Sequence, residues 1–179
     1  RLPSQNAGEN LAPWAAFGQA NQEYSPLQLA NYIATLCGGG ERYATHLLKN
    51  VRSSGTGALE YVYDAAPVET ITMDEQNLAA VLGGMHDLAT EGAVSFCFKD
   101  CIVDAGAKTG TVQTGDEENN NGAFVCFAPY DDPQIAVAII IEKGGTGAAL
   151  ASTAVQILNA YFSNSADASA ATGENILLR

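Results

Sequence analysis

The chain has 179 residues and a mass of 18.6 kDa, which is enough for one domain with a sizeable buried core. Hydrophobic residues make up 47% of it, a share typical of globular rather than disordered proteins. Eight basic residues against 20 acidic ones give a formal net charge of −12. That balance excludes a nucleic-acid partner, because binding the phosphate backbone requires clustered cations.

The first helix signal follows a stretch rich in turn-forming residues. Residues 1–24 show little periodicity, so we expect a loop there. Ser25 is a good N-cap and Pro26 suits the first helical turn, and apolar residues then recur at helical spacing as far as Cys37. The run Gly38-Gly39-Gly40 is expected to end the helix.

Two strands and a second helix are predicted next. The runs His46–Val51 and Leu59–Tyr63 flank turn-forming residues and predict a pair of strands. The segment Thr72–Glu75 fits a capping box that begins at Thr72. The helix after it carries an apolar stripe that we expect to face the core, formed by Leu78, Val81, Leu82, Met85 and Leu88.

The last part of the chain predicts three more strands and a helix. The strands are expected in the runs Ala107–Thr114, Phe124–Phe127 and Ile135–Ile141, with a solvated acidic loop at 115–122. Short connections favour an antiparallel meander, and runs that are apolar on both faces predict helices on both sides of an α+β fold. Ala148–Phe162 predicts the closing helix. We therefore expect a domain at 1–162 and a polar tail at 163–179.

The most informative stretch is Lys108-Thr109-Gly110-Thr111. On a strand, Lys108 and Gly110 lie on one face, and Thr109 and Thr111 lie on the other. Gly110 lets a ligand approach the backbone closely, and the outward N–H groups of a sheet edge are able to bind it. An ammonium and a hydroxyl together hold a carboxylate well. The stretch therefore predicts an edge strand that binds a carboxylate.

The cysteines and histidines give no metal signal. Cys37, Cys97, Cys101 and Cys126 show no CxxC pair and no Cys/His spacing typical of zinc sites, so we expect no metal and no cofactor. Free buried thiols are one interpretation of the cysteines, and a disulfide such as Cys101–Cys126 in an exported protein is the other. His46 and His86 have no neighbouring motif, and we expect packing or surface roles for both.

The order of the short motifs is more specific than any one of them. It runs through Gly18-Gln19, Ser25–Ala30, His46–Lys49, Val81–Met85, Ala107–Thr111, Phe127–Ala138 and Gly144–Gly147 to a terminal helix. In this order the chain resembles the C-terminal half of the transpeptidase domain of class B penicillin-binding proteins, from about Leu2 to Phe162. The resemblance implies the serine transpeptidase and β-lactamase fold, an antiparallel sheet with helices packed on both faces.

The resemblance also implies roles for the residues of the Lys-Thr-Gly element. By this likeness Lys108 supports the electrostatics of the active site, and the hydroxyls of Thr109 and Thr111 bind the terminal carboxylate of the substrate. Gly110 belongs to the same substrate-binding segment. The backbone N–H of Thr111 supplies one arm of an oxyanion hole, a donor typically worth about 3 kcal/mol in the barrier.

Two further motifs of the family are missing. No serine of this chain has Lys three residues further on, so the Ser-x-x-Lys nucleophile is absent. Ser4-Gln5-Asn6 matches Ser-x-Asn formally, but it lies too close to Gly18-Gln19 and occupies the place of another family segment. Ala20 also stands where many relatives have Gly. We expect both motifs upstream of Arg1 in a longer parent protein, and we expect this chain alone to be inactive.

The activity that the resemblance implies is that of a peptidoglycan D,D-transpeptidase involved in cell-wall synthesis, cell shape and antibiotic resistance. Such enzymes cross-link D-Ala-D-Ala stem peptides by acyl transfer and are acylated by β-lactams. The implied partners are the stem peptide, β-lactam antibiotics and the N-terminal half of the same domain, at the extracytoplasmic face of the bacterial membrane. Two alternatives are a non-catalytic β-lactam sensor and a serine β-lactamase. The β-lactamase fits less well because Gly18-Gln19 and Ser25–Gln28 are synthase features.

Overall fold

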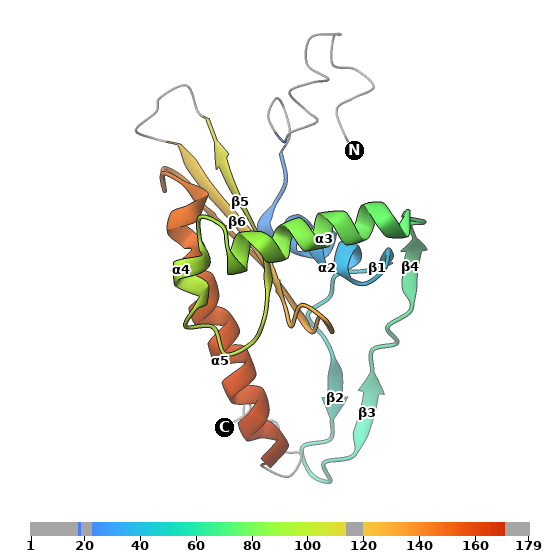
Figure 1. Cartoon of the computed structure of the whole chain (residues 1–179). Coiled ribbons are helices and arrows are strands. Elements are labelled where there is room, and N and C mark those ends of the chain that lie inside the picture. Colours follow the sequence, from blue (N-terminus) through green and yellow to red (C-terminus); the bar gives the residue numbers. More distant parts are fainter. Residues whose placement is uncertain (1–17, 19–22, 114–119, 171–179) are drawn as a thin grey trace.

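The computed structural model describes residues 18, 23–113 and 120–170, and side chains as far as residue 164 (Figure 1). Three expectations therefore lie partly or wholly outside the described residues: the N-terminal loop with Ser4-Gln5-Asn6, most of the acidic loop, and the end of the tail. The elements, in chain order, are α2 (Pro26–Cys37), β1 (Glu41–Tyr43), β2 (Asn50–Arg52), β3 (Leu59–Val62), β4 (Pro67–Thr70), α3 (Glu75–Thr90), α4 (Ser95–Phe98), β5 (Gly106–Val112), β6 (Asn121–Ala128), β7 (Ile135–Ile141), the 3-10 helix η3 (Gly147–Leu150) and α5 (Ala151–Ala170).

The centre of the molecule is the sheet β5-β6-β7. Both neighbouring pairs are antiparallel, so the predicted meander is confirmed. The register places Lys108 opposite Val125, and Val125 opposite Ala138. The short connection between β6 and β7, Pro129–Gln134, leaves no room for the crossover that a parallel pair requires.

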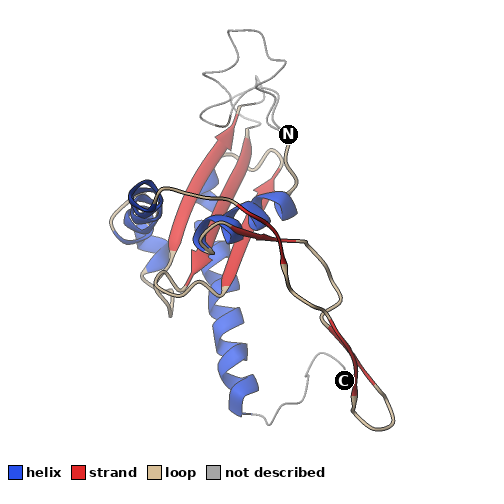
Figure 2. Ribbon diagram, turned by 90° about the vertical axis from the view of Figure 1, so that its right-hand side faces the viewer, coloured by secondary structure: helices blue, strands red, loops and turns tan. Residues whose placement is uncertain are grey.

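Helices cover both faces of this sheet, as the apolar runs predict. The α5 helix lies behind the sheet in Figure 2 and α2 lies in front of it. On the α5 face, Phe124 and Cys126 pack with Leu158 in the larger core cluster. On the α2 face, Phe127 packs with Ile33 of α2 and Met85 of α3. Alternate residues of β6 therefore enter two separate apolar layers, which is why the strand is apolar from Ala123 to Ala128.

The sequence predicts the N-terminal cap of α2 correctly but not that of α3. At α2 the prediction is confirmed, because the Ser25 hydroxyl accepts from the Gln28 N–H and the Gln28 side chain accepts from the Ser25 N–H. At α3 the predicted cap at Thr72 is wrong. Asp74 is the N-cap and accepts from the Asn77 N–H at 2.9 Å. Asp and Thr are both good caps, so local sequence did not distinguish the two positions.

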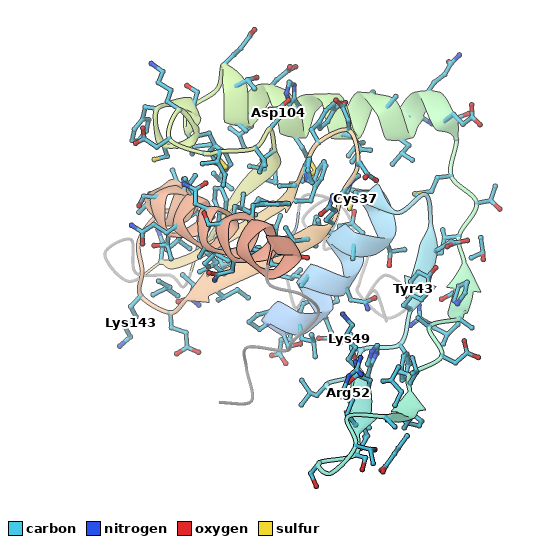
Figure 3. All side chains as sticks on the ribbon, turned by 90° about the horizontal axis from the view of Figure 1, so that it is seen from below. Cys37, Tyr43, Lys49, Arg52, Asp104 and Lys143 are labelled. Carbon is cyan, nitrogen blue, oxygen red and sulfur yellow. The ribbon has the colours of Figure 1, made fainter. Side chains whose placement is uncertain are left out.

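Residues 41–71 form two antiparallel strand pairs, which we call the arm. β1 pairs with β4, and β2 pairs with β3 in the chain segment between them. Figure 3 shows the arm, with Tyr43, Lys49 and Arg52 labelled, to one side of the sheet and its helices. The sequence prediction was partly wrong here. Residues 46–49 are not in a strand, the strand begins at Asn50, and β1 and β4 were missed. Strands of three or four residues, nearly all exposed, carry too little alternation to be read.

Helix boundaries differ from the predicted ones in the C-terminal region. The closing helix begins as η3 at Gly147 and continues as α5 to Ala170, so it does not end at Phe162. No Gly or Pro interrupts 151–170, and the next glycine is Gly173, so nothing in the sequence stops the helix earlier. The short helix α4 was not predicted.

All four cysteines are free, so the Cys101–Cys126 disulfide is not formed in this structure. Cys126 is buried on the α5 face of β6 in the larger core cluster, against which the partly buried Cys97 and Cys101 also pack. Burial in this apolar layer raises the pKa of the Cys126 thiol to about 12, and a smaller contribution comes from Cys101. Buried and neutral, Cys126 acts as a small apolar core residue.

Candidate active-site strand

The strand that carries Lys108 lies at the edge of the sheet. β5 pairs with β6 on one side and has no strand neighbour on the other among the described residues. Its first residues, Gly106 and Ala107, are buried, and exposure begins at Lys108. Gly106 is required there because a Cβ at this position would lie 2.4 Å from Cε1 of Phe127. Close packing thus fixes the position of Gly106 at the start of β5. The strand becomes exposed to solvent from Lys108 onward, where the predicted site begins.

A second set of contacts holds the chain just before β5. Asp104 Oδ2 lies 2.8 Å from Nε2 of His86 on α3, and the Asp104 carbonyl accepts from the Tyr130 N–H after β6. The ring of His86 also packs against that of Tyr130, with centroids 4.3 Å apart. These contacts give His86 the packing role that we expected. His46 packs on Tyr63 in the arm at 3.5 Å and also has such a role.

The predicted site residues divide between the two faces of β5. Lys108 pairs with Val125 and therefore lies on the α2 face, and Thr109 pairs with Phe124 and lies on the α5 face. The Lys108 ammonium donates to the carbonyl of Thr109. The Thr111 hydroxyl accepts from the Gly147 N–H at 3.4 Å. The four residues are thus contiguous on the edge strand, and their side chains alternate as the sequence predicts.

A cavity of about 480 Å³ opens beside Lys108. Its walls are almost wholly apolar and come from α2, α3 and β6, including Tyr32, Ile33, Leu36, Val81, Met85 and Val125. Lys108 is the one charged residue in its lining. Sequence reasoning missed this cavity, because it arises between two helices that are far apart in the chain. The Lys108 ammonium thus lies between this apolar cavity and the edge of β5 that has no strand neighbour among the described residues.

The described residues contain no group of three or more His, Cys, Asp or Glu side chains arranged to hold a metal ion. The edge strand itself carries one ammonium, two hydroxyls and backbone N–H groups. Such a set binds and orients a carboxylate and stabilises negative charge that develops next to it. The Ser-x-x-Lys pattern does not occur in the sequence.

Comparison with known proteins decides the family. A family model described as "Penicillin binding protein transpeptidase domain" matches residues 1–162. The chain belongs to this family. The resemblance predicted from the order of the sequence motifs is thereby confirmed.

The penicillin-binding proteins most useful for comparison are much longer than this chain. Penicillin-binding protein 2A of Bacillus subtilis is 30% identical over 139 residues, covering 70% of this chain and 19% of that protein. Peptidoglycan D,D-transpeptidase PbpA of Mycolicibacterium smegmatis is 29% identical over 150 residues, covering 76% and 29%. This chain therefore spans less than a third of either relative.

A solved structure confirms the serine transpeptidase fold. Penicillin-binding protein PBP2 of Pseudomonas aeruginosa, solved in complex with WCK 5153, superposes with a TM-score of 0.64 at 28% sequence identity. The superposition covers 80% of this chain and 32% of that one. The α+β architecture predicted from the sequence is thus the architecture of a penicillin-binding transpeptidase domain.

Proposed function

We propose that this chain is the C-terminal portion of a peptidoglycan D,D-transpeptidase and contributes half of its active site. The single observation that supports this most strongly is the edge strand β5, which presents Lys108-Thr109-Gly110-Thr111 beside an apolar cavity. The relative in M. smegmatis is named a peptidoglycan D,D-transpeptidase, which supports the same activity. The substrate is the D-Ala-D-Ala end of a stem peptide, and β-lactams compete for its place.

The proposed division of labour follows from what the strand contains and what it lacks. Lys108 supplies a positive charge, and the hydroxyls of Thr109 and Thr111 bind the terminal carboxylate of the peptide. The N–H of Thr111 donates to the carbonyl oxygen as negative charge develops on it. The nucleophilic serine and its base come from the portion of the parent protein that precedes Arg1. The strand thus orients the peptide, and the other half attacks it.

The location proposed for the parent is the extracytoplasmic face of the bacterial membrane, where peptidoglycan is cross-linked. Among the described residues, no helix has both the length and the apolar character needed to cross a bilayer. The location is proposed from membership of the penicillin-binding transpeptidase family.

The first test measures acylation of the parent protein and of this chain by a labelled penicillin, using intact-mass spectrometry. The parent is expected to form a stable adduct and this chain alone is expected to form none, because the nucleophile is missing. A stable adduct on the isolated chain would contradict the proposal.

Turnover of a D-Ala-D-Ala stem-peptide analogue by the parent supports a transpeptidase. An adduct without turnover indicates a sensor, and rapid hydrolysis of a chromogenic cephalosporin indicates a β-lactamase.

The second test is the variant Lys108→Ala in the parent protein. Its acylation rate is expected to fall by about 10²–10³-fold, the typical effect of removing one preorganised electrostatic group from an active site. The matched control is Lys99→Ala, which removes another exposed lysine at the end of α4, away from the site strand. Equal acylation rates for the two variants would exclude a role for Lys108 in the site.

A further inference from the structure

Residues 143–147, which follow β7, are hydrogen-bonded to the beginning of β6. The Lys143 N–H donates to Asn121 Oδ1 at 2.9 Å, and the Gly145 N–H donates to the Asn120 carbonyl at 2.9 Å. Lys143 has a left-handed backbone with φ of 55°, which is uncommon for a residue with a side chain. Its own side chain is exposed and labelled at the outer edge of the molecule in Figure 3. Backbone contacts therefore direct residues 143–147 back across the sheet.

Gly147, at the end of this segment, lies directly on the backbone of the site strand. A Cβ added to Gly147 would lie 2.3 Å from the Gly110 carbonyl oxygen and 2.7 Å from the Gly110 nitrogen. It would also lie 2.2 Å from the carbonyl oxygen of Ala123, the residue paired with Gly110. All three atoms belong to the backbone of paired strands, so no side chain is able to rotate away. Only glycine allows this approach.

The same segment also contacts the next residue pair of the strand. The Gly147 N–H donates to the Thr111 hydroxyl, and Gly122, which is paired with Thr111, lies beneath Thr146. A Cβ on Gly122 would lie 3.3 Å from the Thr146 carbonyl oxygen. Residues 146–147 thus support the end of β5 from the α5 face, opposite the face that carries Lys108.

We propose that Gly147 is a positioning residue of the active site: by supporting Gly110 and Thr111 from behind, it sets the position of the strand edge that holds the substrate carboxylate. This inference rests on the proposed function. A side chain at position 147 would push Gly110 and Thr111 outward, and with them the backbone N–H and the hydroxyl assigned to the substrate. Misplacement of a catalytic group by about 1 Å is able to lower a rate about 10²-fold.

The test is the acylation rate of the full parent protein carrying Gly147→Ala, compared with wild type. We expect a loss of about tenfold or more. The matched control is Gly83→Ala in α3, where an added Cβ has no heavy atom within 4 Å, and it is expected to react like wild type. If Gly147→Ala does not fold, Asn121→Ala provides the second variant. It removes the acceptor that holds Lys143 without adding an atom, and a smaller loss in the same direction is expected.

A double-mutant cycle separates positioning from general destabilisation. If Gly147 acts through the strand edge, its effect on acylation shrinks when Thr111→Val has already altered that edge, and the two losses do not multiply. Wild-type acylation by both Gly147→Ala and Asn121→Ala, or losses that multiply in the cycle, would overturn the inference. Absence of acylation in the wild-type parent would instead overturn the proposed function itself, so the two failures are distinguishable.

Discussion

The sheet and the arm are both antiparallel, yet they are stabilised in different ways. In β6, Phe124, Cys126 and Phe127 are fully buried between two helical layers. In β3 and β4 every residue is exposed. Large apolar side chains such as Leu59 and Val62 are present in the arm, but no second layer covers them among the described residues. Apolar composition therefore does not by itself bury a strand, since a second layer must pack on it.

The comparison also concerns cooperativity. A two-stranded hairpin alone is marginally stable in water, and the β2–β3 pair has no other sheet partner in the described part of the chain. The arm is held by its own backbone bonds and by its attachment near α2, where Asn31 Nδ2 donates to the Tyr43 carbonyl at 2.9 Å. We therefore expect changes in the sheet to alter global stability and changes in the arm to have little effect.

The largest effect is expected for Leu158→Ala, which removes a fully buried α5 side chain from the larger core cluster. The variant should lose about 2–5 kcal/mol of unfolding free energy, measured by urea denaturation, because it leaves a cavity. Its matched control is Leu59→Ala in β3, whose side chain is 51% exposed and which should change stability by less than about 0.5 kcal/mol. Equal losses for the two leucines would contradict the distinction between sheet and arm.

A second prediction concerns alkaline pH and the buried layer of the sheet. Because burial raises the pKa of Cys126 from 9.0 to about 12, the folded state keeps the proton that the unfolded state releases. The stability from this group is fully present below pH 9 and is lost as the pH rises from 9 towards 12, by about 1.4 kcal/mol per unit. Cys126→Ala should show a shallower decline in unfolding free energy over this range. Parallel curves for the two proteins would be evidence against the buried, protonated thiol.

The smallest effect is expected in the arm, at the ion pair that joins β1 and β4. Arg42 Nε lies 2.9 Å from Glu69 Oε2, but the side chains are 43% and 54% exposed, so water and salt screen the pair. Arg42→Ala should cost about 0.2–1 kcal/mol at low salt and less at high salt. Denaturation at both salt concentrations measures this. A loss as large as that of Leu158→Ala would show that the arm is part of the cooperative core.

The candidate site was partly predictable from the sequence. The run Lys108-Thr109-Gly110-Thr111 has strand-forming residues, alternating side chains and a glycine that leaves the backbone open to close approach, and all of these are local properties. The cavity beside Lys108 was not predictable. Most of its walls come from α2 and α3, and the apolar spacing within each helix does not show that the two helices pack near each other. Gly147 was part of a motif used for the family resemblance, but its contact with Gly110 depends on a chain reversal after β7.

The sequence by itself determined the order of the sheet strands, the helices on both faces, the α2 cap and the family. These follow from local periodicity and from motifs that are contiguous in the chain. Tertiary structure alone decided which apolar residues are buried, where the arm projects, and that a glycine 37 positions after Gly110 touches its backbone. The physical reason is that burial and close backbone contact depend on which distant segment packs against a residue, and one residue's own neighbours in sequence do not specify that segment.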